Sequence, residues 1–174
     1  MSGRKRAIVY IDGFNLYYGA LKRTPFKWLN LQAFAEAITP RQFTVERARY
    51  FTAKVSPTPA NPSVHVRQSA YLDALCAHCS KVQIHLGHFL RHKAMAEAVA
   101  PAGTLVQIWR TEEKGSDVNL AVHLVHDAFS AGMEAAVIVS NDSDLVEAIR
   151  LVKSRGVEVF WFPPLGASPS CKGA

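Results

Sequence analysis

Long hydrophobic runs are absent from this sequence. No apolar stretch approaches the ~20 residues that a helix needs to cross a bilayer, so we expect no membrane-spanning segment and no membrane partner. The basic start, Met-Ser-Gly-Arg-Lys-Arg, is followed by a short apolar run at 7–11 that Asp12 and Gly13 interrupt, which does not match a signal peptide. Cysteine is also scarce, and three residues of this type do not make a disulfide framework. These absences favour a soluble, cytoplasmic protein.

Acidic residues are outnumbered by basic ones. The chain carries 14 Asp and Glu against 20 Lys and Arg, for a formal net charge of +6. Apolar residues make up 49% of the 174 positions, enough for one folded core. No internal repeat or linker divides the chain, so we expect a single domain over 1–174 with an irregular tail from about residue 163. The basic excess suits a polyanionic ligand.

Short apolar segments alternate with helical patterns. Strands are expected at 7–11, 45–55, 82–86, 135–140 and 157–162, with a weaker candidate at 104–111 and no clear pattern over 91–103. Helices are expected at 31–38 with Asn30 as N-cap, at 63–79, at 116–130 with Ser116 as N-cap, and at 144–155. This alternation predicts an α/β fold, a central parallel sheet with helices on both faces.

The apolar spacing of the 116–130 segment also predicts which side chains face the core. We expect the inner face of this helix to consist of Val118, Ala121, Leu124, Val125 and Phe129.

Aspartates follow several of these strands. Asp12 comes directly after the first strand, and Asp142 lies just past the strand at 135–140. Asp117 falls in the first turn of one expected helix and Asp144 at the start of another, where an acid is ordinary because it complements the helix dipole. Ligands of open α/β sheets bind at the carboxyl ends of strands, where strand order reverses. If the two strands are neighbours, their carboxylates converge there, and a cluster of them suits Mg²⁺ or Mn²⁺ and a phosphodiester substrate.

Three motifs carry a family resemblance. The stretches IDGFNLY (11–17), KGSDVNLA (114–121) and SNDSDL (140–145) resemble the motifs of NYN domains, PIN-like nucleases that include the LabA/DUF88 group. The segment YFTAKV…RQSAYLDAL…VQIHLGHF within 50–89 resembles the same group, so the likeness runs from about 6 to 162. The resemblance implies a Rossmann-like PIN fold and metal-dependent cleavage of RNA. It implies these metal-binding acids: Asp12, Asp117, Asp142 and Asp144.

The resemblance also carries Asn15 over as a polar site residue that holds a metal-bound water or a phosphate oxygen. We add Lys114 as a hypothesis for stabilising phosphate charge, with a solvated lysine as the alternative, and assign Ser140 and Asn141 to substrate binding. The expected partner is single-stranded RNA. Members of this group often continue with another helix after the last strand, whereas this chain has a Pro/Gly/Ser tail, so the covering of the sheet edge and a homodimer stay open.

Other readings have less support. The residues Cys76, Cys79, His85 and His88 have side chains that zinc uses, but their spacing matches no finger, and thiols packed as small hydrophobes are favoured. A nucleophilic-aspartate phosphatase would need a second acid where Phe14 stands, and no glycine-rich nucleotide loop is present. A non-catalytic RNA-binding module remains the main alternative to the nuclease, and a protein-interaction scaffold that does not need the acids is a third.

Overall fold

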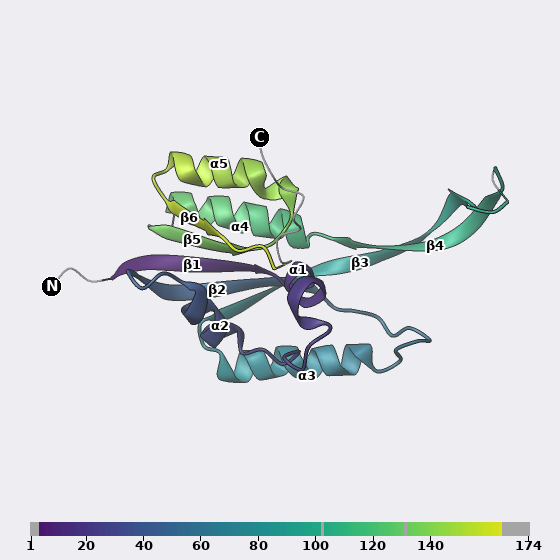
Figure 1. Ribbon diagram of the computed structural model, residues 1–174, viewed down its shortest axis with the longest axis horizontal. Coiled ribbons are helices and arrows are strands. Elements are labelled where there is room, and N and C mark those ends of the chain that lie inside the picture. The colour runs from purple at the N-terminus through teal and green to yellow at the C-terminus, as the bar shows by residue number, and fades with distance from the viewer. Residues whose placement is uncertain (1–3, 102, 131, 165–174) are drawn as a thin grey trace.

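The computed structural model describes residues 4–101, 103–130 and 132–164. These residues form a six-stranded sheet in the order β4-β3-β2-β1-β5-β6 (Figure 1). The strands are β1 (Lys5–Asp12), β2 (Phe43–Ala53), β3 (Val82–Glu97), β4 (Leu105–Lys114), β5 (Ala135–Val139) and β6 (Glu158–Trp161). Every neighbouring pair is parallel except β3 and β4, which are antiparallel. The prediction of an α/β sheet is confirmed, and the prediction that it is parallel throughout is wrong for β4.

Helices cover both faces of the sheet, as predicted (Figure 1). One face packs against α2 (Leu31–Ile38) and α3 (Val64–His78), and the other against α4 (Ser116–Ser130) and α5 (Val146–Ser154). A short helix α1 (Gly13–Leu16) and a π-helical turn η1 (Tyr17–Leu21) follow β1 directly. A 3₁₀ turn η2 (Ser143–Leu145) precedes α5. None of the described helices is long and apolar enough to span a membrane.

The central strand β1 explains why the sequence reads as an unbroken apolar run there. It pairs with β2 on one side and β5 on the other, and both of its faces are covered by helices. Val9 and Ile11 pack towards α2 and α3, while Ile8 and Tyr10 pack towards α4 and α5. A parallel strand buried on both faces has no solvent-facing position for a polar residue until its end. Asp12 stands at that end.

Helix starts were predicted to within one or two residues. Asn30 caps α2 as expected, because its side chain accepts a hydrogen bond from the Ala33 N–H at 2.9 Å. Helix α4 begins at Ser116, so Ser116 is not its N-cap; the Asn119 N–H bonds to the carbonyl of Gly115, whose φ of 99° few other residues adopt. The helix expected at 144–155 begins as the 3₁₀ turn η2 and is α-helical only from Val146.

Strands β3 and β4 extend beyond the sheet as a two-stranded ribbon, which we call the arm (residues 88–114). It projects away from the helical layers (Figure 1). Within the described residues, no arm side chain belongs to a core cluster. No clear sequence pattern was found over 91–103, because these two strands pair with each other and no buried face imposes a period on their apolar residues. The irregular tail expected from about 163 lies almost wholly outside the described residues.

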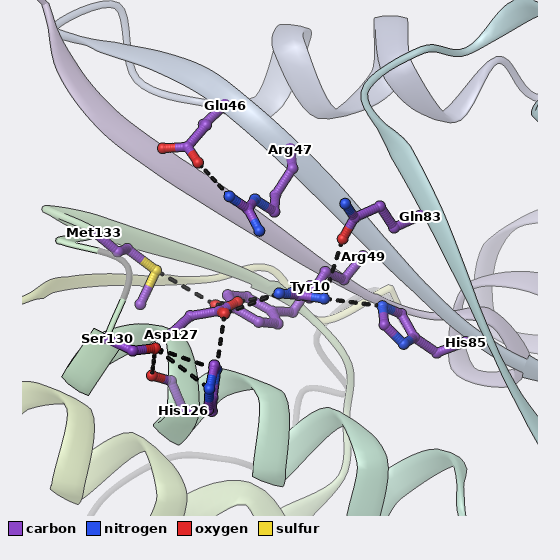
Figure 2. Close-up of polar contacts among 10 residues, drawn as sticks. All are labelled: Tyr10, Glu46, Arg47, Arg49, Gln83, His85, His126, Asp127, Ser130 and Met133. Atoms are coloured by element: carbon purple, nitrogen blue, oxygen red, sulfur yellow. Dashed lines mark hydrogen bonds and ion pairs between the residues drawn. The ribbon is translucent and has the colours of Figure 1, made fainter.

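A buried ion pair fixes α4 on the sheet (Figure 2). Asp127, 1% exposed on α4, accepts hydrogen bonds from Arg49 Nε at 2.7 Å and Nη2 at 2.8 Å and from the Tyr10 hydroxyl at 2.8 Å. Arg49 Nη1 also contacts Gln83 and His85 of β3, each at 3.1 Å. One carboxylate near the C-terminal end of α4 thus ties the helix to β1 and β2.

Candidate active site

Asp12 and Asp142 lie where the strand order reverses. From β1 the chain builds β2 and β3 on one side, and β5 and β6 are added on the other side. Since β1 and β5 are parallel neighbours, with Ile11 opposite Val139, their carboxyl ends share one edge of the sheet. Asp12 is the last residue of β1, and Ser140 directly follows β5. The adjacency that we expected for these two strands is therefore present.

The hydroxyl of Ser140 links the end of β1 to the loop that follows β5. Ser140, fully buried, donates a hydrogen bond from Oγ to Asp12 Oδ2 at 3.0 Å and accepts one from the Asp142 N–H at 3.0 Å. Its own carbonyl accepts a hydrogen bond from the Trp161 indole N–H at the end of β6. Ser140 thus orients Asp12 and Asp142 together. Sequence reasoning gave no role to Trp161, because nothing in its neighbourhood marks it.

Asn15 is the second organiser of the site. Its backbone N–H donates to Asp12 Oδ1 at 3.0 Å, its side-chain amide donates to Asp12 Oδ2, and its Oδ1 accepts from the Asn141 N–H at 3.3 Å. Asp12, only 2% exposed, is therefore the N-cap of α1 and is held from three directions. In this structure Asn15 orients the Asp12 carboxylate and the loop after β5, and its predicted contact with a metal-bound water or a phosphate oxygen stays a prediction.

Asp142 and Asp144 also have ordinary structural duties. Asp142 Oδ1 accepts a hydrogen bond from the Asp144 N–H at 2.9 Å and caps η2, while Asp144 is exposed. Capping uses only part of a carboxylate, which offers about four lone-pair sites. Asp142 thus has the ordinary role of an acid at a helix start, and its carboxylate keeps further lone pairs for another partner.

Asp117 is coupled electrostatically to the other acids. Loss of solvation and the charges of Asp12, Asp142, Glu113 and Asp144 raise the pKa of Asp117 to about 6. Loss of solvation is the largest cause and the neighbouring charges add to it, although the side chain of Asp117 is partly open to solvent. Burial likewise raises the pKa of Asp12; hydrogen bonds from Asn15 and Ser140 oppose that effect, and the charge of Asp142 adds to it.

Glu113 is an acid that sequence reasoning missed. It lies at the end of β4, and its Oε1 accepts hydrogen bonds from the Ser116 N–H at 3.2 Å and hydroxyl at 2.8 Å. It therefore anchors the start of α4 beside Asp117. Its position three residues before the first residue of α4 was the sequence feature that could have indicated this role.

The donor set has the chemistry of a hard-cation site. Its oxygens come from carboxylates, which Mg²⁺ and Mn²⁺ prefer, and their mutual repulsion is what a cation would relieve. In the loop after β5, the Asn141 Nδ2 donor is buried with no hydrogen-bond partner among the described residues, but an amide N–H does not ligate a cation. In the part of the chain that the structure describes, no three His, Cys, Asp or Glu side chains are close enough to hold a metal as they stand. The oxygen donors are of the type that a hard cation prefers, and binding of a cation by Asp12, Asp117, Asp142 and Asp144 stays a prediction.

The other predicted residues lie around this edge. Lys114, at the end of β4, forms an ion pair with Glu112 at 2.8 Å and is half exposed. Its contact with a substrate stays a prediction, as do those of Ser140 and Asn141. Of the residues weighed for zinc, Cys79 is buried at the end of α3, and His85 is stacked on Phe51 with ring centroids 4.8 Å apart.

One of the comparisons with known proteins, the family model, agrees with the motifs. The NYN domain model matches residues 6–174, so the chain belongs to the NYN domain family, a PIN-like nuclease family. One curated relative is 6-hydroxy-3-succinoylpyridine 3-monooxygenase HspA of Pseudomonas putida (strain DSM 28022 / S16), 32% identical over 174 residues. That alignment covers 86% of this chain and 56% of the relative, so the chain spans just over half of that protein. No solved structure matches.

Proposed function

We propose that this chain is a Mg²⁺- or Mn²⁺-dependent ribonuclease that hydrolyses phosphodiester bonds of single-stranded RNA, in the cytoplasm. The observation that carries the proposal is the convergence of Asp12 and Asp142 on Ser140 at the reversal of strand order. Asp117 is coupled to the same charges, and the chain belongs to a nuclease-like family.

The residues of the chain have separable duties in such a site. Ser140 and Asn15 hold the Asp12 carboxylate in one orientation, so no reorganisation is needed when a substrate arrives. Asp117 enters from α4, which Asp127 and Arg49 lock to the sheet. A bound divalent cation would supply a Lewis acid and lower the pKa of a water molecule.

The arm supports a polyanionic substrate. Residues opposite each other in an antiparallel pair lie on the same face, so Lys93 opposite Trp109 and Arg91 opposite Thr111 share one face of the ribbon. Trp109 is 57% exposed, with Arg91 Cζ 4.5 Å and Lys93 Nζ 5.6 Å from its ring centroid. Exposed aromatic rings beside cations are typical of single-strand binding surfaces. The base of the arm reaches the site, because Phe89 packs edge-on against Phe14 of α1 at 5.8 Å.

The decisive experiment is cleavage of a labelled single-stranded RNA by purified protein with Mn²⁺ or Mg²⁺. We expect cleavage that EDTA stops and Mn²⁺ restores. Asp12→Asn and Asp142→Asn keep the side-chain shape and remove the charge, so each should lower the rate by at least ~100-fold, comparable to losing one preorganised electrostatic group. RNA binding by both variants should be unchanged or tighter. Asp73→Asn, an exposed acid on α3, is the matched control and should cut normally.

The same experiment tests the alternatives. Wild-type protein that binds RNA but never cuts it would establish the binding-module reading. Substitutions of all the acids without any effect on binding or cellular function would favour the interaction scaffold. A homodimer stays a prediction, which sedimentation of the purified protein would decide.

A second candidate function follows from the similarity to HspA. A monooxygenase inserts one oxygen atom of O₂ into its substrate and needs a two-electron donor. If this chain shared that chemistry, it should consume O₂ when given a substituted hydroxypyridine and a reduced nicotinamide or flavin. Oxygen uptake that depends on the pyridine, without RNA cleavage, would replace the ribonuclease proposal.

A further inference from the structure

A cavity lined by aromatic side chains opens beside the carboxylate edge. It has a volume of about 170 Å³ and lies between α1, η1, the end of β2 and α3. Its aromatic walls are Phe14, Tyr17, Tyr18, Trp28, Tyr50 and Tyr71. Sites for drug-sized ligands usually measure roughly 300–1,000 Å³, so this cavity has room for about one ring system.

The cavity and the carboxylate site share the start of α1. Asp12 caps this helix, and the next two residues, Gly13 and Phe14, line the cavity. Gly13 packs so closely on β2 that a Cβ atom there would lie 2.8 Å from the Tyr50 hydroxyl oxygen. Tyr50 also senses the Asp12 charge, which adds to burial in raising the pKa of its phenol to about 12. A ligand in the cavity would therefore contact residues that directly follow Asp12 in the sequence.

Two polar side chains of the walls, Tyr71 and Gln68, are already hydrogen-bonded to the backbone. The Tyr71 hydroxyl donates to the Leu29 carbonyl at 2.7 Å, and the Gln68 side chain bonds to the backbone of Ala53 and Val55. The rest of the lining consists largely of aromatic rings, and it also includes two exposed cations, Lys27 and Arg67, of which Arg67 donates hydrogen bonds to Ser63 and Asn61. Ring faces beside cations match a flat heteroaromatic ring attached to an anionic group, the chemistry of a nucleotide.

We propose that this cavity binds one unstacked base of the single-stranded RNA, next to the phosphodiester at the Asp12 edge. The inference rests on the proposed function, whose substrate it makes more specific. The aromatic walls stack on the base, while Lys27 and Arg67 face its phosphate. Stacking on aromatic side chains is tolerant of base identity, since every base has a ring face. The site then favours single strands, because a paired base is not free to enter.

Trp28 offers the cleanest test. It is 58% exposed and packs edge-on against Tyr71 with ring centroids 5.9 Å apart, so its removal leaves the buried core intact. Phe26, two residues earlier and 67% exposed, does not line the cavity and is the matched control. The measurement is the affinity for a hexauridylate and for the same strand with abasic positions, made with EDTA present so that nothing is cut.

Trp28→Ala should weaken hexauridylate binding about 5- to 150-fold, the range that corresponds to losing one stacked base. Phe26→Ala should bind as the wild type does, and the abasic strand should bind equally to all three proteins. Equal hexauridylate affinity of both variants would overturn the inference, as would an equal loss on the abasic strand. Tyr18→Ala, a second exposed wall residue, guards against local rearrangement and should behave like Trp28→Ala.

Binding of free pyridine-3-carboxylate distinguishes a cavity that takes an RNA base from one that takes a small-molecule ligand. If it binds to the wild type and not to Trp28→Ala, while hexauridylate binding ignores the substitution, the cavity serves a free ring and the base assignment is wrong. Failure of the ribonuclease proposal would give a different set of results. In that case Trp28→Ala would still weaken RNA binding, but the wild type would cut nothing with Mn²⁺.

Discussion

Asp127 is a buried carboxylate whose charge is balanced inside the molecule. Burial alone would raise its pKa, but hydrogen bonds from Arg49 and Tyr10 outweigh burial and hold the pKa below its usual range. Asp127→Asn would leave the Arg49 guanidinium buried without its counter-ion. Breaking such a pair costs about 3–5 kcal/mol, and we expect a loss of this size in the free energy of unfolding from urea titration. Asp73→Asn should change it by less than ~0.5 kcal/mol, and a similarly small loss for Asp127→Asn would contradict this account.

His85 makes stability depend on pH. Burial, then the charges of His123 and Arg49, lower its pKa to about 4, from 6.5 in a free side chain. Arg49 Nη1 lies 3.1 Å from His85 Nε2, a contact that needs a neutral ring. The folded state therefore resists protonation, so this contribution to stability is complete above pH 6.5 and is lost as the pH falls towards 4.

His85→Gln keeps an acceptor for Arg49 and removes the titration. Its melting temperature should fall less than that of the wild type between pH 7 and pH 5. His65→Gln, at an exposed position on α3, should follow the wild type over the same range. A His85→Gln protein that loses as much stability as the wild type would remove His85 from this role.

At the residue scale, sequence reasoning found the acids at strand ends and missed the buried charges. Asp12 and Asp142 follow unbroken apolar runs, which makes them conspicuous. Asp127 and Arg49 sit inside regular elements and look like surface residues until their partner is known. This pair also explains why the predicted inner face of α4 is wrong at two positions: the buried side is formed by Leu120, Leu124 and Asp127, while Val118 and Phe129 are 66% and 55% exposed.

At the scale of elements, the arm should contribute to RNA affinity and not to folding. Arg91→Ala/Lys93→Ala removes two exposed cations from its basic face. Each phosphate contact on a single strand contributes about 0.7 to the slope of log affinity against log salt, so the slope should become shallower by roughly 1.4. The measurement is fluorescence anisotropy of a labelled RNA at several salt concentrations.

The control for the arm is Lys5→Ala/Lys153→Ala, which removes the same charge from β1 and α5. This variant should keep the wild-type slope, and both variants should melt like the wild type. An equal change of slope for the two pairs would show that net charge matters and the arm does not.

The elements differ in how far sequence could predict them. The strands and helices that share the core were found because burial leaves a mark on their apolar residues: an unbroken run in β1 and β5, alternation in β2 and a helical period of 3.6 in the helices. The arm has no buried face, so its polar and alanine-rich stretch carried no such period. The antiparallel direction of β4 depends on that ribbon, which is why the sheet was expected to be parallel throughout.

On the scale of the whole molecule, a divalent cation should stabilise the fold. A ligand that binds only the folded state at one hundred times its Kd adds about 2.7 kcal/mol, and each kcal/mol raises the melting temperature by about 2–4 °C for a chain of this size. Millimolar Mn²⁺ or Mg²⁺ should therefore shift the wild-type melting temperature by several degrees. Asp142→Asn should melt higher than the wild type in EDTA, because one repelling charge is gone, and should not respond to metal.

A metal response of Asp142→Asn equal to that of the wild type would place the cation elsewhere. A second comparison uses Glu147→Gln, an exposed acid on α5 outside the cluster. It should respond to metal as the wild type does.

The pairing of β1 with β5 determines when, during synthesis of the chain, the proposed site can form. Ser140 lies 128 residues after Asp12, although one hydrogen bond joins their side chains. At a synthesis rate of about 5–20 residues per second, roughly 6–26 s pass between the making of the first residue and the making of the second. Until β5 leaves the ribosome, one edge of β1 has no strand beside it and the carboxylates have not met. The residues of the proposed site therefore come together only after β5 has been made and paired with β1.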